Sequence, residues 1–344
     1  MEATNRSLLI VFKRGGKNSL FQYDLVTGRI MWHFVEDNEH LFLNFAISRN
    51  SDDVVLVLRN RSGYSVCKLH LYEQDEVINI NLLMASYDDI KVPKKVSILS
   101  GNDGITGFLF EANRQTIGAI LYLHGGPGHQ ASASADPLIR YFLNLGFSVL
   151  DIDYHGSSGH GDKFQDSINQ HIGHLELIDT LAGMNFLKSR FDRLPVGVCG
   201  NSYGGFLALQ VLASSQNQFE FGIDVAGVVD WTATLEQLPA FWEKKRDKIY
   251  RRFGNPYRDF AYLQQISPVS YSQRIRVPIM IVHGQRDARV KIEQVENFFS
   301  RLKENNKNVQ LTVAKNAGHD VLATRQADII YRKIASFLEC SLKS

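Results

Sequence analysis

The chain has 344 residues, of which 44% are hydrophobic and 22% charged, a composition typical of a folded globular protein and outside the range of disordered segments. Because 38 basic residues are nearly balanced by 36 acidic ones, the net charge is only +2, and no nucleic-acid partner is expected. No apolar run approaches the roughly 18 residues that cross a bilayer, so no membrane association is expected either.

The cysteines and the amino terminus both bear on location. Three scattered cysteines, Cys67, Cys199 and Cys340, are too few for a disulfide framework or a zinc site. The first residues also lack the charged and apolar stretches of a signal peptide. We therefore expect a cytoplasmic location.

Residues 1–93 are predicted to form a small β-rich domain. Short, half-alternating runs such as residues 7–13 and 53–60 are separated by turn residues such as those at 27–28 and 62–63. A Lys-Val-Pro-Lys-Lys stretch at 91–95 is typical of a linker.

Residues 94–344 are predicted to form an α/β domain. A β-hairpin at 96–112 is followed by alternating strands and helices. Near-continuous apolar strands between amphipathic helices indicate a mostly parallel, buried sheet with helices on both faces. A long, aromatic-rich stretch at about 231–267 breaks this alternation and is predicted to be a helical insertion. The strands are expected at 116–126, 147–154, 195–200, 222–229, 277–284 and 309–315, and the helices near 135–146, 172–190, 203–214, 291–305 and 320–340.

Ser202 lies in the sequence Gly-Asn-Ser-Tyr-Gly-Gly, between a predicted strand and a predicted helix. A sharp strand-to-helix turn exposes a nucleophilic serine, and it needs glycine two positions to either side, here Gly200 and Gly204. A tight turn with a chance serine is the simpler interpretation. The position between strand and helix favours the nucleophile of an α/β-hydrolase fold.

A serine hydroxyl needs a base, and the base needs an orienting acid, in the chain order serine, acid, histidine. Asp287 follows one late strand and His319 follows the next, so we predict that these residues complete the triad. Asp230 is the rival acid. His283, the other histidine after Ser202, is expected to lie within a strand.

Two backbone N–H groups are expected to bind the oxyanion of the tetrahedral intermediate. One belongs to Tyr203, and the other to Gly126 in the glycine-rich loop at 124–128. Each such donor typically stabilises the transition state by roughly 3 kcal/mol.

Together these motifs resemble the catalytic domain of the prolyl oligopeptidase family of serine peptidases, with acylaminoacyl-peptidase-like members most similar. The resemblance covers about residues 95–344 and implies the same triad, Ser202, Asp287 and His319, and the same oxyanion donors. The shared motifs are HGGPG at 124–128, DYHGSSGHGDKF at 153–164, GNSYGG at 200–205, VVDW at 228–231, ISPVSY at 266–271, HGQRDARV at 283–290 and NAGHD at 316–320.

The chain departs from the family in two places. His155 stands where the family usually has arginine, and because this loop borders the site, we expect His155 to bear on substrate preference. Members also carry a many-bladed propeller, whereas residues 1–93 have room for two blades of roughly 40 to 45 residues. Two blades leave no place for the acidic residues that anchor a substrate's free amino group in some relatives, so strict dipeptidyl-peptidase behaviour is disfavoured. Two blades also cannot close a ring, so we expect their open strand edges either to pack on the hydrolase domain or to pair with another copy in a dimer or larger assembly.

Other features carry weaker signals. His171 and His174 have a spacing that metal ligands can use, but no third ligand accompanies them, and no metal site is predicted. Trp231, Phe241 and Trp242 either line an apolar specificity pocket or pack as core beneath the insertion. The basic residues at 244–246 and 251–252 are typical of a solvated face, and less often of a site that attracts an acidic substrate.

The leading hypothesis is a serine hydrolase that cleaves peptide or amide bonds of small peptides through an acyl-enzyme, without a cofactor. The alternative is an esterase, thioesterase or acyltransferase that uses the same triad on a small-molecule or natural-product acyl group. A third hypothesis is a non-catalytic binding protein on a hydrolase fold, which the complete set of triad residues disfavours.

Overall fold

The computed structural model describes residues 2–3, 7–14, 17–35, 41–47, 53–60, 63–70, 78–80 and 91–342, apart from 134, 215 and 307. Before residue 91, the backbone forms two four-stranded antiparallel sheets in which the strands follow chain order, as in propeller blades. The first contains β1 (Glu2–Ala3), β2 (Ser7–Arg14), β3 (Lys17–Asp24) and β4 (Ile30–Val35). The second contains β5 (Leu41–Ile47), β6 (Asp53–Asn60), β7 (Gly63–His70) and β8 (Ile78–Ile80).

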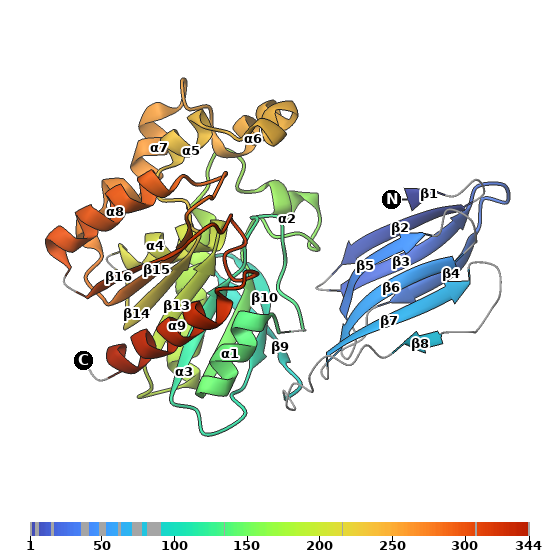
Figure 1. Cartoon of the computed structure of the whole chain (residues 1–344), viewed down its shortest axis with the longest axis horizontal. Helices are drawn as coiled ribbons and strands as arrows, with labels where there is room; N and C mark the ends of the chain where they lie inside the picture. Colours follow the sequence, from blue (N-terminus) through green and yellow to red (C-terminus); the bar gives the residue numbers. More distant parts are fainter. Residues whose placement is uncertain are drawn as a thin grey trace.

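An eight-stranded sheet organises the rest of the chain (Figure 1), in the order β16-β15-β14-β13-β11-β12-β10-β9. The six strands from β16 to β12 run parallel, and β10 and β9 join antiparallel as a hairpin. This arrangement confirms the predicted fold class. The strands are β9 (Lys94–Ser100), β10 (Asp103–Phe110), β11 (Gly118–Leu123), β12 (Phe147–Asp153), β13 (Val196–Asn201), β14 (Phe221–Val225), β15 (Ile279–Gly284) and β16 (Val309–Ala314).

Helices cover both faces of this sheet, and each face has its own apolar core. The core on one face is contributed by α3 (Leu175–Arg190), α4 (Tyr203–Leu212) and α8 (Ile292–Asn305). On the other face α1 (Pro137–Leu145) and α9 (Ala327–Ser341) supply the core. Burial on both faces explains why β11 to β15 read as continuous apolar runs rather than as alternating ones.

Local sequence sets several helix ends. Asp136 caps α1 by accepting hydrogen bonds from the N–H groups of Leu138 and Ile139, and Gly146 ends this helix in the left-handed region with φ 95°. By contrast, α9 begins at Ala327 rather than near the expected residue 320, because residues 319–324 form turns.

The stretch expected to form an insertion contains several short helices, one of which, α6 (Arg246–Phe253), lies beside α2 (Asp162–Asp166) in Figure 1. The elements of this stretch are α5 (Trp231–Glu236), the 3₁₀ helix η1 (Ala240–Lys245), α6 and α7 (Phe260–Ile266), followed by the 3₁₀ helices η2 (Pro268–Ser270) and η3 (Ser272–Arg274). The eight-stranded sheet starts at Lys94, and the division of the chain into two domains near residue 93 stays a prediction.

Candidate active site

Ser202 lies in the turn between β13 and α4, with φ 55° and ψ −113°. This conformation is rare for a residue with a side chain, and it aims the serine away from both elements. The neighbouring glycines allow a close backbone approach. A Cβ atom on Gly200 would lie 1.9 Å from the carbonyl oxygen of Gly204, and one on Gly204 would lie 2.0 Å from that of Leu123.

The structure brings Ser202 together with the two other residues predicted for the triad. The Nε2 atom of His319 lies 2.8 Å from Ser202 Oγ, and its Nδ1 atom lies 2.7 Å from Asp287 Oδ2. Asp287 follows β15, and His319 follows β16. These two loops and the turn after β13 meet because the carboxyl ends of parallel strands share one edge of the sheet.

Asp287 is held in place by more than the histidine. Its Oδ1 atom accepts hydrogen bonds from the backbone N–H groups of Arg289, at 2.8 Å, and Val290, at 3.1 Å. Burial raises the pKa of Asp287, but the hydrogen bond from His319 and the backbone donors outweigh this effect, so the pKa lies below its usual value. The group is therefore a carboxylate at neutral pH, suited to orient an imidazole and to stabilise its charged form.

The rival acid, Asp230, and the other histidine, His283, make other hydrogen bonds, although His283 Nε2 also lies 3.5 Å from Asp287 Oδ2. Asp230 caps α5 by accepting a hydrogen bond from the N–H of Ala233 at 3.0 Å. His283 is fully buried in β15, and its Nε2 atom bonds the carbonyl oxygen of Val290 at 2.9 Å. Burial lowers the pKa of His283, which makes this ring a neutral part of the core.

The two expected oxyanion donors, Gly126 and Tyr203, line the same cavity as Ser202 and His319. Tyr203 is the first residue of α4, so its N–H lies at the positive end of the helix dipole. Gly126 has φ 128°, and a Cβ atom there would lie 2.5 Å from the N atom of Gly128. The loop can take this shape only with glycine at this position.

The cavity beside Ser202 has a volume of about 210 Å³ and is mainly apolar. The insertion supplies much of its wall, and the guanidinium-bearing Arg289 also lines it, 5.4 Å from the ring of Trp242. Its apolar lining consists of Val228, Trp231, Leu235, Leu238, Trp242, Ile249, Phe253 and Val290.

The residues expected to bind substrate fall into two groups. Trp231 and Trp242 both line the cavity, and Trp231, which is only 3% exposed, is also part of the apolar core, so both interpretations apply to it. Phe241 and His155 are not among the residues that line it. Phe241 is 61% exposed, and His155 is buried with its Nδ1 atom 2.8 Å from Asp179 Oδ2.

Sequence reasoning missed several lining residues, notably Arg289 and Phe253. Arg289 had a usable signal, since it stands two positions after the expected triad acid. Phe253 had none, because its position depends on how α6 folds back over the sheet.

Within the described part of the chain, no group of three or more His, Cys, Asp and Glu side chains could hold a metal ion. Cys199 and Cys340 are free thiols. The helices described here include none that is both long and apolar enough to span a membrane.

Comparisons with known proteins agree with this architecture. The sequence model of the prolyl oligopeptidase family matches residues 134–344. Dipeptidyl peptidase family member 6 of Caenorhabditis elegans is 28% identical over 225 residues, which cover 64% of this chain and 30% of that protein. The acylamino-acid-releasing enzyme of Arabidopsis thaliana is 25% identical over 214 residues, 58% of this chain and 27% of that enzyme.

Solved structures match over nearly the whole chain. The acylaminoacyl peptidase of Pyrococcus horikoshii gives a TM-score of 0.83 at 18% identity, covering 98% of this chain and 55% of that one. A puromycin hydrolase gives 0.77 at 19% identity, covering 98% and 51%. These likenesses establish the fold. The chain spans less than a third of the length of the two curated relatives and about half of each of these structures.

Proposed function

Because this chain belongs to the prolyl oligopeptidase family, we propose that it is a serine peptidase that cleaves small peptides through an acyl-enzyme. The observation that carries the proposal is the continuous hydrogen-bond path from Ser202 Oγ through the His319 ring to Asp287. A serine, a base and an orienting carboxylate within this reach are the parts that acyl transfer requires.

In the first step, Ser202 Oγ attacks the scissile carbonyl carbon, and its proton passes to Nε2 of His319. Asp287 keeps the other ring hydrogen on Nδ1 and stabilises the imidazolium that forms. The backbone N–H groups of Gly126 and Tyr203 bind the oxyanion, whose charge develops at the amino terminus of α4. When the intermediate collapses, the C–N bond breaks, and the leaving amine takes the proton from His319.

In the second step, water replaces the amine. His319 takes a proton from the water as its oxygen attacks the acyl carbon, and a second tetrahedral intermediate forms in the same oxyanion site. Its collapse breaks the ester bond, returns the proton to Ser202 and releases the carboxylic acid. These groups and water complete the cycle, so no cofactor is needed.

The cavity favours an apolar side chain on the residue whose carbonyl is attacked. Trp231, Leu235 and Phe253 offer it an aromatic and aliphatic wall. Arg289 lines the same cavity and can donate a hydrogen bond to a backbone carbonyl oxygen other than the one under attack, and a peptide has such a second carbonyl whereas a simple ester lacks it. This feature favours a peptide over the ester alternative.

The test compares a p-nitroanilide with the p-nitrophenyl ester of the same acylated phenylalanine. We expect both to be cleaved, and Ser202→Ala to abolish both activities and the labelling of the protein by a fluorophosphonate. Ser300→Ala, which alters an exposed serine on α8, is the matched control and should behave as wild type. Turnover of the ester alone would overturn the peptidase assignment in favour of an esterase or acyltransferase, and an unreactive Ser202 would favour a binding protein.

Two further expectations belong to this proposal. A cytoplasmic location is supported by the two free thiols among the described residues, and cell fractionation tests it. Self-association into a dimer or larger assembly is supported by the outer position of β9 and β16 in the eight-stranded sheet, and light scattering on the purified protein tests it.

A further inference from the structure

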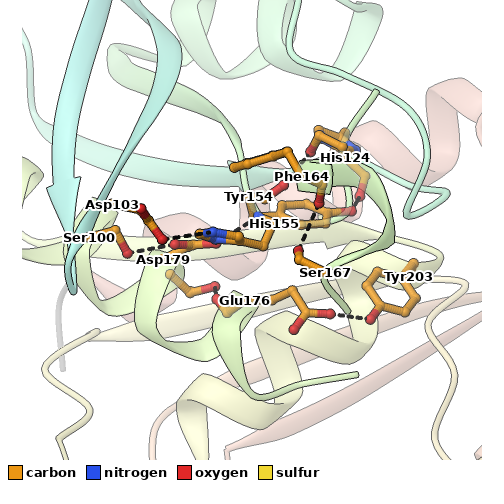
Figure 2. A network of polar contacts seen from close by, with 12 residues as sticks. Ser100, Asp103, His124, Tyr154, His155, Phe164, Ser167, Glu176, Asp179 and Tyr203 are labelled. Atoms are coloured by element: carbon orange, nitrogen blue, oxygen red, sulfur yellow. Dashed lines mark hydrogen bonds and ion pairs between the residues drawn. The ribbon is translucent and has the colours of Figure 1, made fainter. Parts of the chain in front are cut away.

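We propose that Glu176 is a positioning residue for the oxyanion site and acts through the side chain of Tyr203. The inference rests on the proposed function, in which the N–H of Tyr203 binds the oxyanion. The hydroxyl of Tyr203 donates a hydrogen bond to Glu176 Oε1 at 2.5 Å, and both side chains are buried. Figure 2 shows the tyrosine ring extending from α4 toward the carboxyl group on α3.

The backbone beside this contact is strained and needs support from more than one side. Ser202 has φ 55°, and such a conformation persists only where the surroundings over-determine it. On one side, the N–H of Ser202 bonds the carbonyl oxygen of Val225 at 2.8 Å. On the other side, the bond to Glu176 holds the first residue of α4. Oxyanion donors must lie within about 2.7–3.1 Å of the developing charge, so small displacements of the Tyr203 N–H reduce catalysis.

The position of Glu176 is fixed in turn, because hydrogen bonds to Asp179, one turn further along α3, anchor this helix. Asp179 accepts hydrogen bonds from Ser100 Oγ at 2.5 Å and from the backbone N–H of His155 at 2.7 Å. The ring of His155 adds a third contact through Nδ1 at 2.8 Å and stacks on Phe164. Figure 2 shows this cluster joining the end of β9, the segment after β12 and α3. The network therefore fixes the helix that carries Glu176.

The simpler explanation of the Tyr203–Glu176 pair is that Glu176 satisfies the buried tyrosine hydroxyl. This explanation does not account for the free-energy cost of burying a carboxyl group. A phenylalanine at 203 facing an apolar residue at 176 would fill similar space without a buried carboxyl group. Instead, the carboxyl group of Glu176 is fully buried, and its Oε2 atom makes no hydrogen bond of ordinary geometry within the described chain, although the backbone N–H groups of Gly173 and Glu176 lie near enough to the carboxyl group to lower its pKa. Burying a carboxyl group is costly even with this partial compensation, so the pair is expected to do more than fill space.

The contact also survives a change of protonation. Burial raises the pKa of Glu176 to about 7, against the hydrogen bond from Tyr203, which lowers it. Both the carboxylate and the acid are therefore present near neutral pH. A proton on Oε2 leaves Oε1 free to accept the tyrosyl hydrogen, so a glutamine, which resembles the neutral acid, should preserve the tie.

The experiment compares Tyr203→Phe, Glu176→Gln, Glu176→Met and the Tyr203→Phe/Glu176→Met double variant, with active sites counted by fluorophosphonate titration. We expect Tyr203→Phe and Glu176→Met each to lower kcat about tenfold with KM nearly unchanged, because oxyanion binding acts in the transition state. Affinity for a peptidyl trifluoromethyl ketone, whose adduct carries an oxyanion, should weaken by a similar factor. Glu176→Gln should keep most of the activity, and the double variant should lose no more than either single one.

Tyr122→Phe is the matched control, because Tyr122 is another buried tyrosine that donates to a carboxylate, Asp136 Oδ2, at 2.7 Å, in the core on the opposite face of the sheet. It should leave kcat unchanged. Unchanged kcat and ketone affinity in Tyr203→Phe, or losses that multiply in the double variant, would overturn the positioning role. If the wild type binds the ketone covalently but cleaves no peptide, the proposed peptidase function fails, and the ketone affinities still decide the role of Glu176.

Discussion

Replacing Asp287 by asparagine tests the geometry of the proposed triad most directly. Asp287 Oδ1 faces two backbone N–H donors, at 2.8 and 3.1 Å, while Oδ2 faces His319 Nδ1 at 2.7 Å. In Asp287→Asn, the amide oxygen must stay on the side of the two donors. The NH₂ group then replaces Oδ2 and donates to His319 Nδ1. This fixes the ring hydrogen on Nε2, so the ring can no longer accept the proton of Ser202.

The size of the effect follows from losing both the base and the stabilised imidazolium. We expect kcat to fall by about 10³–10⁴, equivalent to about 4–5.5 kcal/mol of lost transition-state stabilisation, with little change in KM. The measurement is steady-state cleavage of the phenylalanine p-nitroanilide, normalised to folded protein by circular dichroism.

Asp230→Asn is the control for this experiment. Asp230 caps α5, and asparagine caps helices about as well, so activity should stay within about twofold of wild type. A loss below tenfold in Asp287→Asn, or an equal loss in Asp230→Asn, would refute the assignment of Asp287 as the orienting acid.

Three further predictions concern the turn that carries Ser202, the cavity beside it and the glycine-rich loop at 124–128. Gly204→Ala should lower the free energy of unfolding by more than about 4 kcal/mol in urea, because its Cβ would lie 2.0 Å from a backbone oxygen, whereas Gly104→Ala, with nothing within 4 Å, should stay within about 0.5 kcal/mol. Phe253→Ala should lower kcat/KM about 10- to 100-fold for a phenylalanine anilide and less than about threefold for an alanine anilide, because a cavity wall is lost. Burial lowers the pKa of His124 to about 4, so the unfolded chain binds more protons below pH 6.5, and stability should fall as the pH drops from about 6.5 to 4, by up to about 1.4 kcal/mol per pH unit. In urea titrations at each pH, His124→Gln should remove this part of the pH dependence of the free energy of unfolding. An unchanged pH dependence would contradict the burial of His124 as a neutral ring.

The sequence predicts the fold well because its strongest signals are local. Five consecutive parallel strands are buried on both faces and appear as apolar runs, and the glycines around Ser202 mark a turn that few other residues permit. Chain order then limits the candidates for acid and base to a few residues, and the structure brings Asp287 and His319 to Ser202.

The cavity is less predictable, because its walls depend on contacts between remote segments. Phe241 and Trp242 are neighbours in η1, yet only Trp242 lines the cavity. The sequence pattern of so short a helix does not predict which of two adjacent aromatic side chains faces the cavity. His155 is withdrawn from solvent by Asp179, which lies 24 residues further along the chain. Glu176 is an acidic residue in the first turn of α3, where the sequence pattern of a helix start predicts a solvent-exposed side chain, yet it is fully buried.

The position of β16 at one edge of the sheet affects how the protein loses activity in mild denaturant. Ser202 follows an interior strand, whereas His319 lies in the turn after β16, which among the described strands pairs only with β15 and forms one edge of the sheet. Edge strands unfold locally at a lower free-energy cost than interior strands do. Mild denaturant should therefore abolish turnover while tryptophan emission still reports a folded protein, and hydrogen–deuterium exchange should be faster at the amides of β16 than at those of the interior strands.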